Sequence, residues 1–599
     1  MDEQSGQPTF VYDGECLFCR AWVEYWRDLT GERVRYAPSQ EVGSEFPQVS
    51  KEEFAAAAKL ILPDREVRSG AHAVFSALAY APGRGHALWA YQRLPGCAAV
   101  AEAVYRLVAR HRSIGYWVTR CLWGIPVRAA TYRLSTWLFL RALGAIYLIA
   151  FASFGVQAAG LIGSRGILPV SAFLNDARAY VGTGSYRLVP TLLWLNSSDK
   201  TIQFIWMAGL LCSILLMVGL NWRSLRFALF VLYLSLVTGG QVFMGYQWDA
   251  LLLEAGFLAM FLGSSPVMVR LFRWLVCRFM FMSGAVKLLS GDPTWRDFTA
   301  LPIHYQTQPL PTPVAWYFFQ LPAWFQHISL GFLFFVELVV PFLVLAPRRL
   351  RHFAALAIAI LQTLIFLTGN YAFFNLLTVA LCLMLLDDRM LGHIPERLAR
   401  RIPNLSYKEG ATWRRRAYEL LAALVILTSA YEMARSFSRF HWAPADAVVS
   451  AIAPFEVINT YGLFAVMTTS RPEIVVEGSN DGVTWLAYEF KYKPGDLRRR
   501  PVWVQPHQPR LDWQMWFAAL GSYQNDPWIL HFMERLLEGS PEVVGLLKEN
   551  PFPRSPPRSV RALVYEYRFT TEAERSATGE WWKRELKGEY LPPIALRQP

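Results

Sequence analysis

The middle of the chain contains hydrophobic runs that are long enough to cross a lipid bilayer. Such runs recur between residues 137 and 434, and each has close to the roughly 20 apolar residues that a helix needs to span the hydrocarbon core. They predict about nine transmembrane helices, at residues 137–158, 203–220, 224–240, 246–263, 271–289, 328–346, 353–369, 371–387 and 416–434. The alternation that is typical of membrane β-barrels is absent from these runs. The pattern predicts a polytopic α-helical membrane domain over residues 130–435.

One connection between the hydrophobic runs is unusually polar and aromatic. It covers residues 290–327, an outer loop between the fifth and sixth predicted spans. Its side chains include Trp295, Arg296, Asp297, His304, Tyr305 and Gln308. A plain connecting loop rarely carries this mixture, so we expect an ordered segment. It either packs against the soluble part of the chain or contributes to a docking surface for a client protein.

Residues 436–599 are predicted to form a soluble, mainly β domain. Residues 472–490 alternate on both sides of Asp481-Gly482, which is a hairpin signal. Residues 560–569 alternate again, and residues 528–547 favour a helix. A further group combines charged and aromatic residues, namely Arg510, Asp512 and Trp513. We favour a packed face for this group, and a client-docking surface is the alternative.

The first residues follow a pattern that is typical of a small α/β redox domain. Thr9–Tyr12 is a short apolar run, and an amphipathic helical pattern follows the turn DGECLFCR. Strand, Cys-x-x-Cys turn and helix is the layout of thioredoxin-like sites, so residues 1–120 are predicted to adopt that fold. Cys16 would attack, because a helix N-terminus stabilises its thiolate, and Cys19 would resolve the mixed disulfide. Half of a zinc site is the alternative, but no second Cys-x-x-Cys follows.

Charge adds an assignment of the two sides of the membrane. The formal net charge is +13, but most of the excess lies in short loops beside hydrophobic runs, which is the positive-inside pattern and not a nucleic-acid footprint. Arginines are dense over residues 105–133, just before the first span. We therefore predict a cytoplasmic N-terminus, with residues 290–327 and 436–599 on the extracytoplasmic side. No cleavable signal peptide is expected, since residues 1–8 are polar and acidic.

The assigned sides determine what the cysteines can do. The cytoplasm is reducing, so Cys16 and Cys19 are expected to cycle with a cytoplasmic thiol reductant and not to form a structural disulfide. The chain has seven cysteines, none of them in residues 436–599, so the outer domain cannot donate a disulfide to a client. His304 has no second histidine at ligand spacing, so no metal site is predicted. No cofactor beyond the dithiol is expected.

Ionisable residues inside the predicted spans form a candidate membrane site. Carboxylates within a bilayer are costly, so Glu254, Glu337 and, nearer the outer surface, Asp249 should each face the bundle interior with a partner. Lys287 and Arg296 are the candidate partners. Lys287 has two interpretations: a lysine that snorkels toward the interface, or a general base, which would require burial.

The N-terminal motif carries a family resemblance. The pattern Tyr-Asp-Gly-x-Cys-x-x-Cys is matched in full by Tyr12, Asp13, Gly14, Cys16 and Cys19. Roughly residues 8–115 resemble the DCC thiol–disulfide oxidoreductase family, which implies dithiol redox activity. Most thioredoxin folds also place a cis-proline opposite the cysteines, and the candidates here are Pro38, Pro63 and Pro82.

The rest of the chain resembles a second family through long motifs of unusual composition. These are GAVKLLSGDPTWRDFTALPIHYQTQPLPTPVAWY (284–317), INTYGLFAVMTTSRPEIVVEGS (458–479) and YEFKYKPGDLRRRPVWVQPHQPRLDWQMWFAAL (488–520). Over roughly residues 130–597 the chain is identified as a member of the lipase maturation factor family. The resemblance implies a membrane-embedded chaperone that helps secreted lipases to fold and assemble.

The same resemblance leaves a second function open. The family shares a distant membrane fold with vitamin K-dependent γ-carboxylases, and residues 284–288 (GAVKL) lie near the position of their catalytic lysine. The alternative is a γ-carboxylase-like enzyme acting on a lipid-soluble substrate, with the dithiol recycling a quinone-like carrier. A deep pocket lined by Lys287 and a carboxylate would favour the enzyme, whereas a solid bundle with an exposed apolar outer surface would favour the chaperone.

Overall fold

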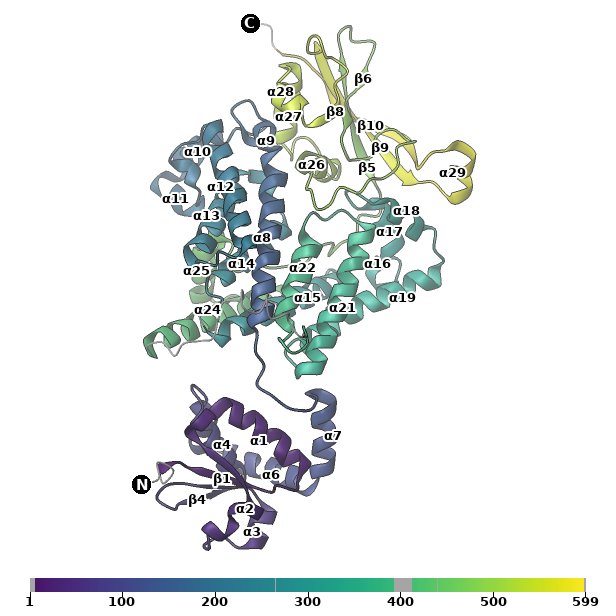
Figure 1. The fold of residues 1–599 in the computed structure, drawn as a ribbon. Helices are drawn as coiled ribbons and strands as arrows, with labels where there is room; N and C mark the ends of the chain where they lie inside the picture. Colours follow the sequence, from purple (N-terminus) through teal and green to yellow (C-terminus); the bar gives the residue numbers. More distant parts are fainter. Residues whose placement is uncertain (1–5, 264, 393–411, 439, 597–599) are drawn as a thin grey trace. The chain divides into compact units, whose positions relative to one another are not determined.

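The computed structural model describes residues 6–263, 265–392, 412–438 and 440–596, and Figure 1 draws its helices and strands. Two compact units are present. The first consists of Met1–Thr131 with Ala346–Phe353, and the second of Tyr132–Leu345 with Ala354–Pro599. The apolar helices and the C-terminal part, which the sequence divides at residue 436, therefore belong to one compact unit.

A four-stranded sheet forms the centre of the first unit. Its strands are β1 (Thr9–Tyr12), β2 (Arg35–Pro38), β3 (Lys59–Ile61) and β4 (Val67–Ser69), in the order β2-β1-β3-β4. β1 runs parallel to β2 and antiparallel to β3. Phe10 and Leu60 are completely buried in the core of this unit. The predicted α/β class of the N-terminal part is confirmed.

Helices connect these strands and extend the unit. They are α1 (Leu17–Thr30), α2 (Ser39–Val42), α3 (Lys51–Ala56), α4 (Gly70–Ala79), α5 (Gly85–Arg93), α6 (Cys97–Arg110) and α7 (Arg112–Leu122). The amphipathic pattern of α1 buries Ala21 and Val23. α7 packs along α1, where the Trp22 indole N–H donates a hydrogen bond to Thr119 Oγ1 at 3.1 Å. The helix that follows the cysteine motif is therefore held in place by α7.

Apolar helices make up the region between residues 133 and 437. The principal ones are α8 (Arg133–Gly155), α12 (Asp199–Val218), α13 (Arg223–Gly239), α14 (Gln247–Met260), α15 (Pro266–Leu289), α19 (Ala323–Phe334), α20 (Val340–Leu343), α21 (Arg348–Thr368), α22 (Phe374–Cys382) and α24 (Thr412–Phe437). A π-helical turn, Phe335–Val339, joins α19 to α20. Every predicted span overlaps at least one of these helices.

Not all of these helices could cross a bilayer by their length and composition. Five stretches of the described chain could do so: Arg133–Gly155, Asp199–Val218, Ala323–Leu343, Arg348–Thr368 and Trp413–Phe437. α13, α14 and α22 have only 17, 14 and 9 residues. α15 has 24 residues but contains three arginines and Lys287. The helical membrane character is thus confirmed, whereas the count of nine spans stays a prediction.

The outer loop of the prediction is largely helical. Residues 290–327 contain α16 (Pro293–Arg296), α17 (Ala300–Thr307), α18 (Pro313–Phe319) and the beginning of α19. Asp292 caps α16 by accepting a hydrogen bond from the Thr294 N–H at 2.8 Å, and Thr312 caps α18 through Ala315. In both helices a proline occupies the first turn, where its missing N–H costs nothing. Pro293 and Pro313 therefore begin helices in this segment.

The C-terminal part is built on a second four-stranded sheet. Its strands are β5 (Pro472–Ser479), β6 (Leu486–Ala487), β9 (Ser559–Phe569) and β10 (Trp582–Ile594), in the order β10-β9-β5-β6; β7 (Glu489–Phe490) pairs with β8 (Leu547–Glu549). The predicted hairpin is present, with Gly478 opposite Leu486. The predicted helix over residues 528–547 is divided into α27 (Trp528–Leu537) and α28 (Pro541–Val544), because Gly539 adopts a φ of 69° and Pro541 begins a new helix.

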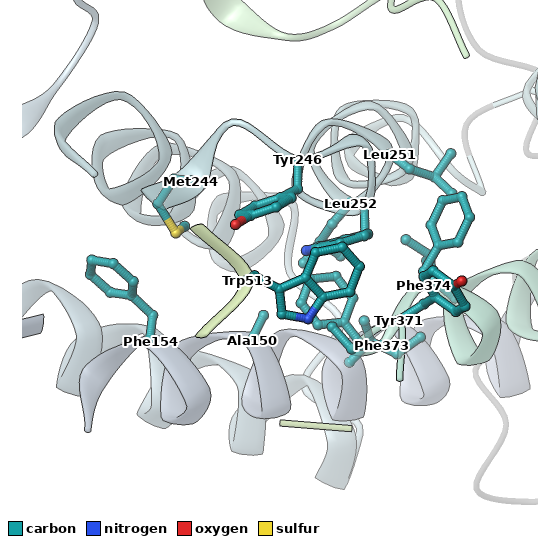
Figure 2. Close-up of a cluster of buried hydrophobic side chains, with 14 of the residues drawn as sticks. Ala150, Phe154, Met244, Tyr246, Leu251, Leu252, Tyr371, Phe373, Phe374 and Trp513 are labelled. Atoms are coloured by element: carbon teal, nitrogen blue, oxygen red, sulfur yellow. The ribbon is translucent and has the colours of Figure 1, made fainter. Parts of the chain in front are cut away.

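One C-terminal helix lies inside the second unit. α26 (Arg510–Ala519) is buried at nearly every position. The Trp513 ring packs against Tyr246, Trp248 and Tyr371, at centroid distances of 5.7, 4.9 and 5.9 Å. Figure 2 shows Trp513 in this cluster together with Ala150 and Phe154, which α8 supplies. The C-terminal part is therefore joined to the apolar helices through a shared core.

Candidate functional site

The dithiol motif lies at the N-terminus of α1. Cys16 is the N-cap residue, and its Sγ accepts a hydrogen bond from the Cys19 backbone N–H at 3.2 Å. The Cys19 thiol donates to Cys16 Sγ, with the two sulfurs 2.7 Å apart. Both cysteines are free thiols and partly buried. The pair is reduced, and the Cys16 sulfur accepts the hydrogen bond of the Cys19 thiol.

These contacts differentiate the two thiols. The pKa of Cys16 falls to about 6, chiefly because the Cys19 thiol donates to its sulfur, with the Cys19 N–H and the positive charge of Arg112 acting in the same direction. The same hydrogen bond, together with burial, raises the pKa of Cys19. At neutral pH Cys16 is therefore the thiolate that can attack a disulfide, and Cys19 is the protonated partner.

Residues outside the cysteine motif complete this site. Arg112, the first residue of α7, forms an ion pair with Asp13 at 2.9 Å and also donates to the Ala55 carbonyl. Gln40 bridges the motif by accepting from the Gly14 N–H at 3.0 Å and donating to Asp13. In the sequence Arg112 is one of many arginines before the first span, and only the fold singles it out.

The proline expected opposite the cysteines is not in the cis form. In the described part of the chain the cis bonds precede Pro126 and Pro506, so Pro38, Pro63 and Pro82 are excluded as cis-prolines. Pro38 nevertheless lies against the motif. A Cβ on Gly14 would stand only 2.8 Å from the Cβ of Pro38. The segments that contain Gly14 and Pro38 approach closely, which explains why glycine occupies the third position of the motif.

We expect Cys16 to react with iodoacetamide at a rate that rises around a pH of about 6. Above that value the thiolate predominates, and the rate should level off within about two pH units. Arg112→Gln should move the midpoint upward, because a positive charge beside the thiolate is lost, whereas Arg110→Gln on the exposed face of α6 should not. Peptide mass spectrometry measures the modified fraction. A wild-type midpoint near 9 would contradict this assignment.

A fully buried ion pair of the second unit joins Asp249 and Arg510. Both side chains are 0 % exposed. The guanidinium contacts both carboxylate oxygens, at 2.8 and 2.9 Å, and Tyr233 donates to the same carboxylate at 2.5 Å. Arg510 also donates to the Phe243 carbonyl at 2.7 Å. Asp249 therefore faces the interior with a partner, as the sequence predicts, and that partner is a C-terminal residue.

Glu254 has a partner on the neighbouring helix. Arg278 of α15 donates directly to Glu254 and to the Asn459 carbonyl, and both charged side chains are at most 2 % exposed. The other carboxylate oxygen accepts from Tyr461 at 2.7 Å and from the Asn459 N–H at 3.1 Å. The partners proposed from sequence, Lys287 and Arg296, are therefore incorrect for this carboxylate. In the sequence Arg278 is one of several arginines within a hydrophobic run, and nothing in the pattern distinguishes it.

Glu337 and Lys287 form the third buried pair. Lys287 Nζ contacts the two Glu337 oxygens at 3.0 and 2.8 Å and donates to the Ser283 carbonyl at 2.8 Å. Glu337 lies in the π-helical turn that joins α19 to α20. Of the two predicted partners, Lys287 is the one that makes the contact. Arg296 is exposed and takes no part in this pair.

The outer segment 290–327 is attached to the C-terminal part through buried polar contacts. Arg471 is completely buried and donates to the carbonyls of Gln306, Gln308 and Pro309 while pairing with Glu473 at 2.8 Å. The Trp295 indole N–H donates to the Phe464 carbonyl at 3.1 Å. Three more hydrogen bonds run from the Met467 N–H to Asp292, from the Trp516 indole to the Thr307 carbonyl and from the Gln320 amide to the Thr570 carbonyl. We call this set of contacts the joint.

His304 of the outer segment lies in a hydrogen-bonded group with Tyr371 and Gln308. Its Nε2 lies 2.8 Å from the Tyr371 hydroxyl, which also donates to Gln308 Oε1 at 2.8 Å. Burial, with a smaller contribution from the Lys287 charge, lowers the pKa of His304 to about 3. The imidazole therefore stays neutral at physiological pH. In the described residues no group of three His, Cys, Asp or Glu side chains is placed to hold a metal ion.

Burial corrects the proposed client surface. The following residues are buried: Trp295, Tyr305, Gln308, Arg510, Asp512 and Trp513. Asp512, for example, accepts hydrogen bonds from the Tyr492 and Lys493 N–H groups, both at 2.8 Å. These side chains are packed within the unit and are not exposed for a client to touch, and for Arg510, Asp512 and Trp513 this agrees with the packed face that the sequence favoured. Arg296 and Asp297 are the exposed members of the predicted set.

A cavity of about 500 Å³ lies elsewhere, in the C-terminal part. It is bordered by β5, β7 and residues 493–498, and its lining includes Lys493, Glu580 and Arg584. It is not lined by Lys287, Glu254 or Glu337. The pocket that the carboxylase alternative requires is therefore not this cavity.

Comparisons with known proteins agree with this division of the chain. Residues 10–115 match a family model described as DCC1-like thiol-disulfide oxidoreductase. Residues 134–393 match the lipase maturation factor transmembrane domain, and residues 457–592 match the lipase maturation factor C-terminal domain. No solved structure matches the chain.

Relatives of known name cover most of the chain. Lipase maturation factor 2 of Gallus gallus is 36% identical, over 77% of this chain and 81% of the relative. Lipase maturation factor 1 of Bos taurus is 35% identical, over 78% of this chain and 90% of the relative. Lipase maturation factor 2 of Homo sapiens is 34% identical, over 78% and 83% of the two chains. This chain therefore belongs to the lipase maturation factor family and carries an additional DCC1-like domain ahead of its transmembrane domain.

Proposed function

We propose that this protein is a membrane-embedded maturation factor that helps secreted lipases to fold or assemble. The observation that carries the proposal is the match of both the transmembrane and the C-terminal domains to the lipase maturation factors. The joint supports it, because it fixes an extensive soluble domain rigidly to the apolar helices. A folding factor needs such a platform at the membrane, where the client emerges.

The alternative, a γ-carboxylase-like enzyme, is less well supported. Its base would be Lys287, and an ammonium group has three protons to donate. All three are directed to acceptors, namely Ser283 O and the two oxygens of Glu337. A general base needs a lone pair facing a substrate, and this geometry leaves none available. We assign Lys287 to the structure of the bundle.

We further propose the nine-span topology with a cytoplasmic N-terminus. The four shorter or more charged helices, α13, α14, α15 and α22, lie at predicted spans, and the buried pairs of Glu254 and Lys287 neutralise charges that lipid would not tolerate. We expect a periplasmic-type reporter fused after Pro599 to be active and a cytoplasmic-type reporter at the same site to be silent. The reverse result would contradict the nine-span topology.

In this topology the dithiol and the client lie on opposite sides of the membrane. The dithiol would then cycle with a cytoplasmic thiol reductant, and it would be dispensable for the client. We expect Cys16→Ser/Cys19→Ser to restore lipase secretion and activity in cells that lack the protein to within about twofold of wild type, because the joint and the helices are untouched.

The experiment compares secreted lipase activity and secreted lipase protein. Secretion of an unrelated monomeric enzyme is measured in the same cells, as a control for general protein export. A normal lipase level in cells lacking the protein would sink the maturation role. If the wild type restored lipase secretion and the double serine variant, expressed at the same level, did not, the dithiol would have a part in maturation.

A further inference from the structure

Two consecutive helices of the first unit carry apolar side chains that the unit does not cover. On α6 these are Val100, Val104 and Leu107, with exposed fractions of 64%, 54% and 61%. On α7 they are Ile114 and Trp117, at 59% and 64%. The spacing of three or four residues places each set along one side of its helix. We call these two exposed sides the α6–α7 face.

The opposite sides of both helices are bound to the rest of the unit. On α6, Glu102 accepts hydrogen bonds from the Ala71 and His72 N–H groups, at 3.3 and 3.0 Å. On α7, Thr119 accepts from Trp22, and a Cβ on Gly115 would lie 3.2 Å from the Phe18 ring. Each helix therefore contacts the unit through its polar and small residues. Its exposed apolar side has no packing role within the unit.

The charges around this face all favour an anionic partner. Residues 97–122 contain four arginines and one acidic residue. The acidic residue, Glu102, faces inward, and Arg112 is paired with Asp13. Arg106, Arg110 and Arg120 are exposed. Arginines beside an apolar helical side are the composition of helices that lie in the headgroup region of a bilayer.

The first unit is tethered to a helix that could span a membrane. Arg128 pairs with Asp28 at 3.0 Å, and the Ala129 N–H donates to the same carboxylate at 3.1 Å, so the unit is fastened as far as Ala129. α8, which is long and apolar enough to cross a membrane, begins at Arg133. Four further residues extend over at most about 14 Å. The short linker makes a lipid surface a partner that the first unit can meet without dissociating.

We propose that the α6–α7 face docks on the surface of an anionic bilayer, with Val104, Leu107 and Trp117 among the acyl chains and Arg106, Arg110 and Arg120 at the phosphates. Because α7 packs on α1 and supplies Arg112 to the dithiol motif, docking holds the redox pair against the membrane surface. This restricts its reaction partners to thiols and disulfides that reach that surface. The proposal does not depend on which client the outer side serves.

The test uses the full-length protein in nanodiscs of phosphatidylcholine, with or without phosphatidylglycerol. Hydrogen–deuterium exchange is read at α6 and α7, with β1 and β3 as internal references. We expect exchange in α6 and α7 to be slower by about tenfold in the anionic discs. Val104→Ser/Leu107→Asn/Trp117→Ser should abolish this protection, and Arg106→Gln/Arg110→Gln/Arg120→Gln should remove its dependence on phosphatidylglycerol.

Matched controls are Val483→Ser, an exposed apolar side chain of the C-terminal part, and Arg65→Gln in the β3–β4 turn; both should leave the protection unchanged. A second probe is a bimane on Cys121, which lies one turn beyond Trp117, in a variant lacking Cys16, Cys19, Cys97 and Cys212. Lipids with a nitroxide near the headgroup should quench it. Equal exchange in neutral discs, anionic discs and detergent, or absence of quenching, would overturn the proposal and indicate that another part of the chain covers the face.

Discussion

Arg510→Met is expected to lower the free energy of unfolding by about 3–5 kcal/mol, the cost of leaving a buried charge without its partner. The variant removes both contacts to Asp249 and the contact to the Phe243 carbonyl. Neither side chain of the pair is exposed, so water cannot replace the lost guanidinium. Since α26 also carries Trp513 into the aromatic cluster, the packing of α26 against the apolar helices should loosen.

Thermal unfolding in detergent, followed by tryptophan fluorescence, measures this loss. Arg554→Met, which removes an exposed arginine of the same part of the chain, is the matched control and should unfold like wild type. The double variant Arg510→Met/Asp249→Leu should recover most of the loss, because no unpaired charge remains. A single variant as stable as the control would show that the Asp249–Arg510 pair does not stabilise the second unit as argued.

Lys287→Met should destabilise the helices to a similar extent, because Glu337 would be left buried without a cation. The decisive variant is Lys287→Met/Glu337→Leu. If the pair only stabilises the bundle, the double variant should regain stability and should also restore lipase secretion in cells lacking the protein. Unfolding midpoints and secreted lipase activity are measured on the same set of variants.

Stability and lipase secretion together distinguish a structural role of Lys287 from a catalytic one. A double variant that is stable, expressed and yet inactive would mean that Lys287 contributes chemistry, and it would revive the enzyme alternative. Arg296→Met is the matched control, since Arg296 is an exposed cation of the same region. It should affect neither stability nor secretion.

The first unit was the more predictable part of the chain. A short apolar strand, a Cys-x-x-Cys turn and an amphipathic helix are local patterns, and β1 and α1 form where they indicate. The contribution of Arg112 could not be predicted in the same way. Arg112 lies 99 positions away from Asp13 in the sequence. The positive-inside rule already accounts for many arginines before a membrane span, so the sequence gives no reason to single out Arg112.

The buried pairs show a similar limit. The cost of a carboxylate in a span correctly predicts that Asp249, Glu254 and Glu337 need partners. Their identities depend on tertiary contacts: the partner of Asp249 is 261 positions away and lies in a part expected to be a separate domain. The sequence patterns also did not indicate β10, whose strand is interrupted by prolines and a glycine.

The separation of Asp249 and Arg510 along the chain has a consequence for biosynthesis. At roughly 5–20 residues per second, the ribosome needs roughly 13 to 52 s to reach Arg510 after Asp249 has been made. During that interval the newly inserted helices contain a carboxylate whose cation does not yet exist. The nascent bundle is thus an unfinished intermediate that depends on the last third of the chain, so a protein proposed to assist the maturation of others is itself late to mature.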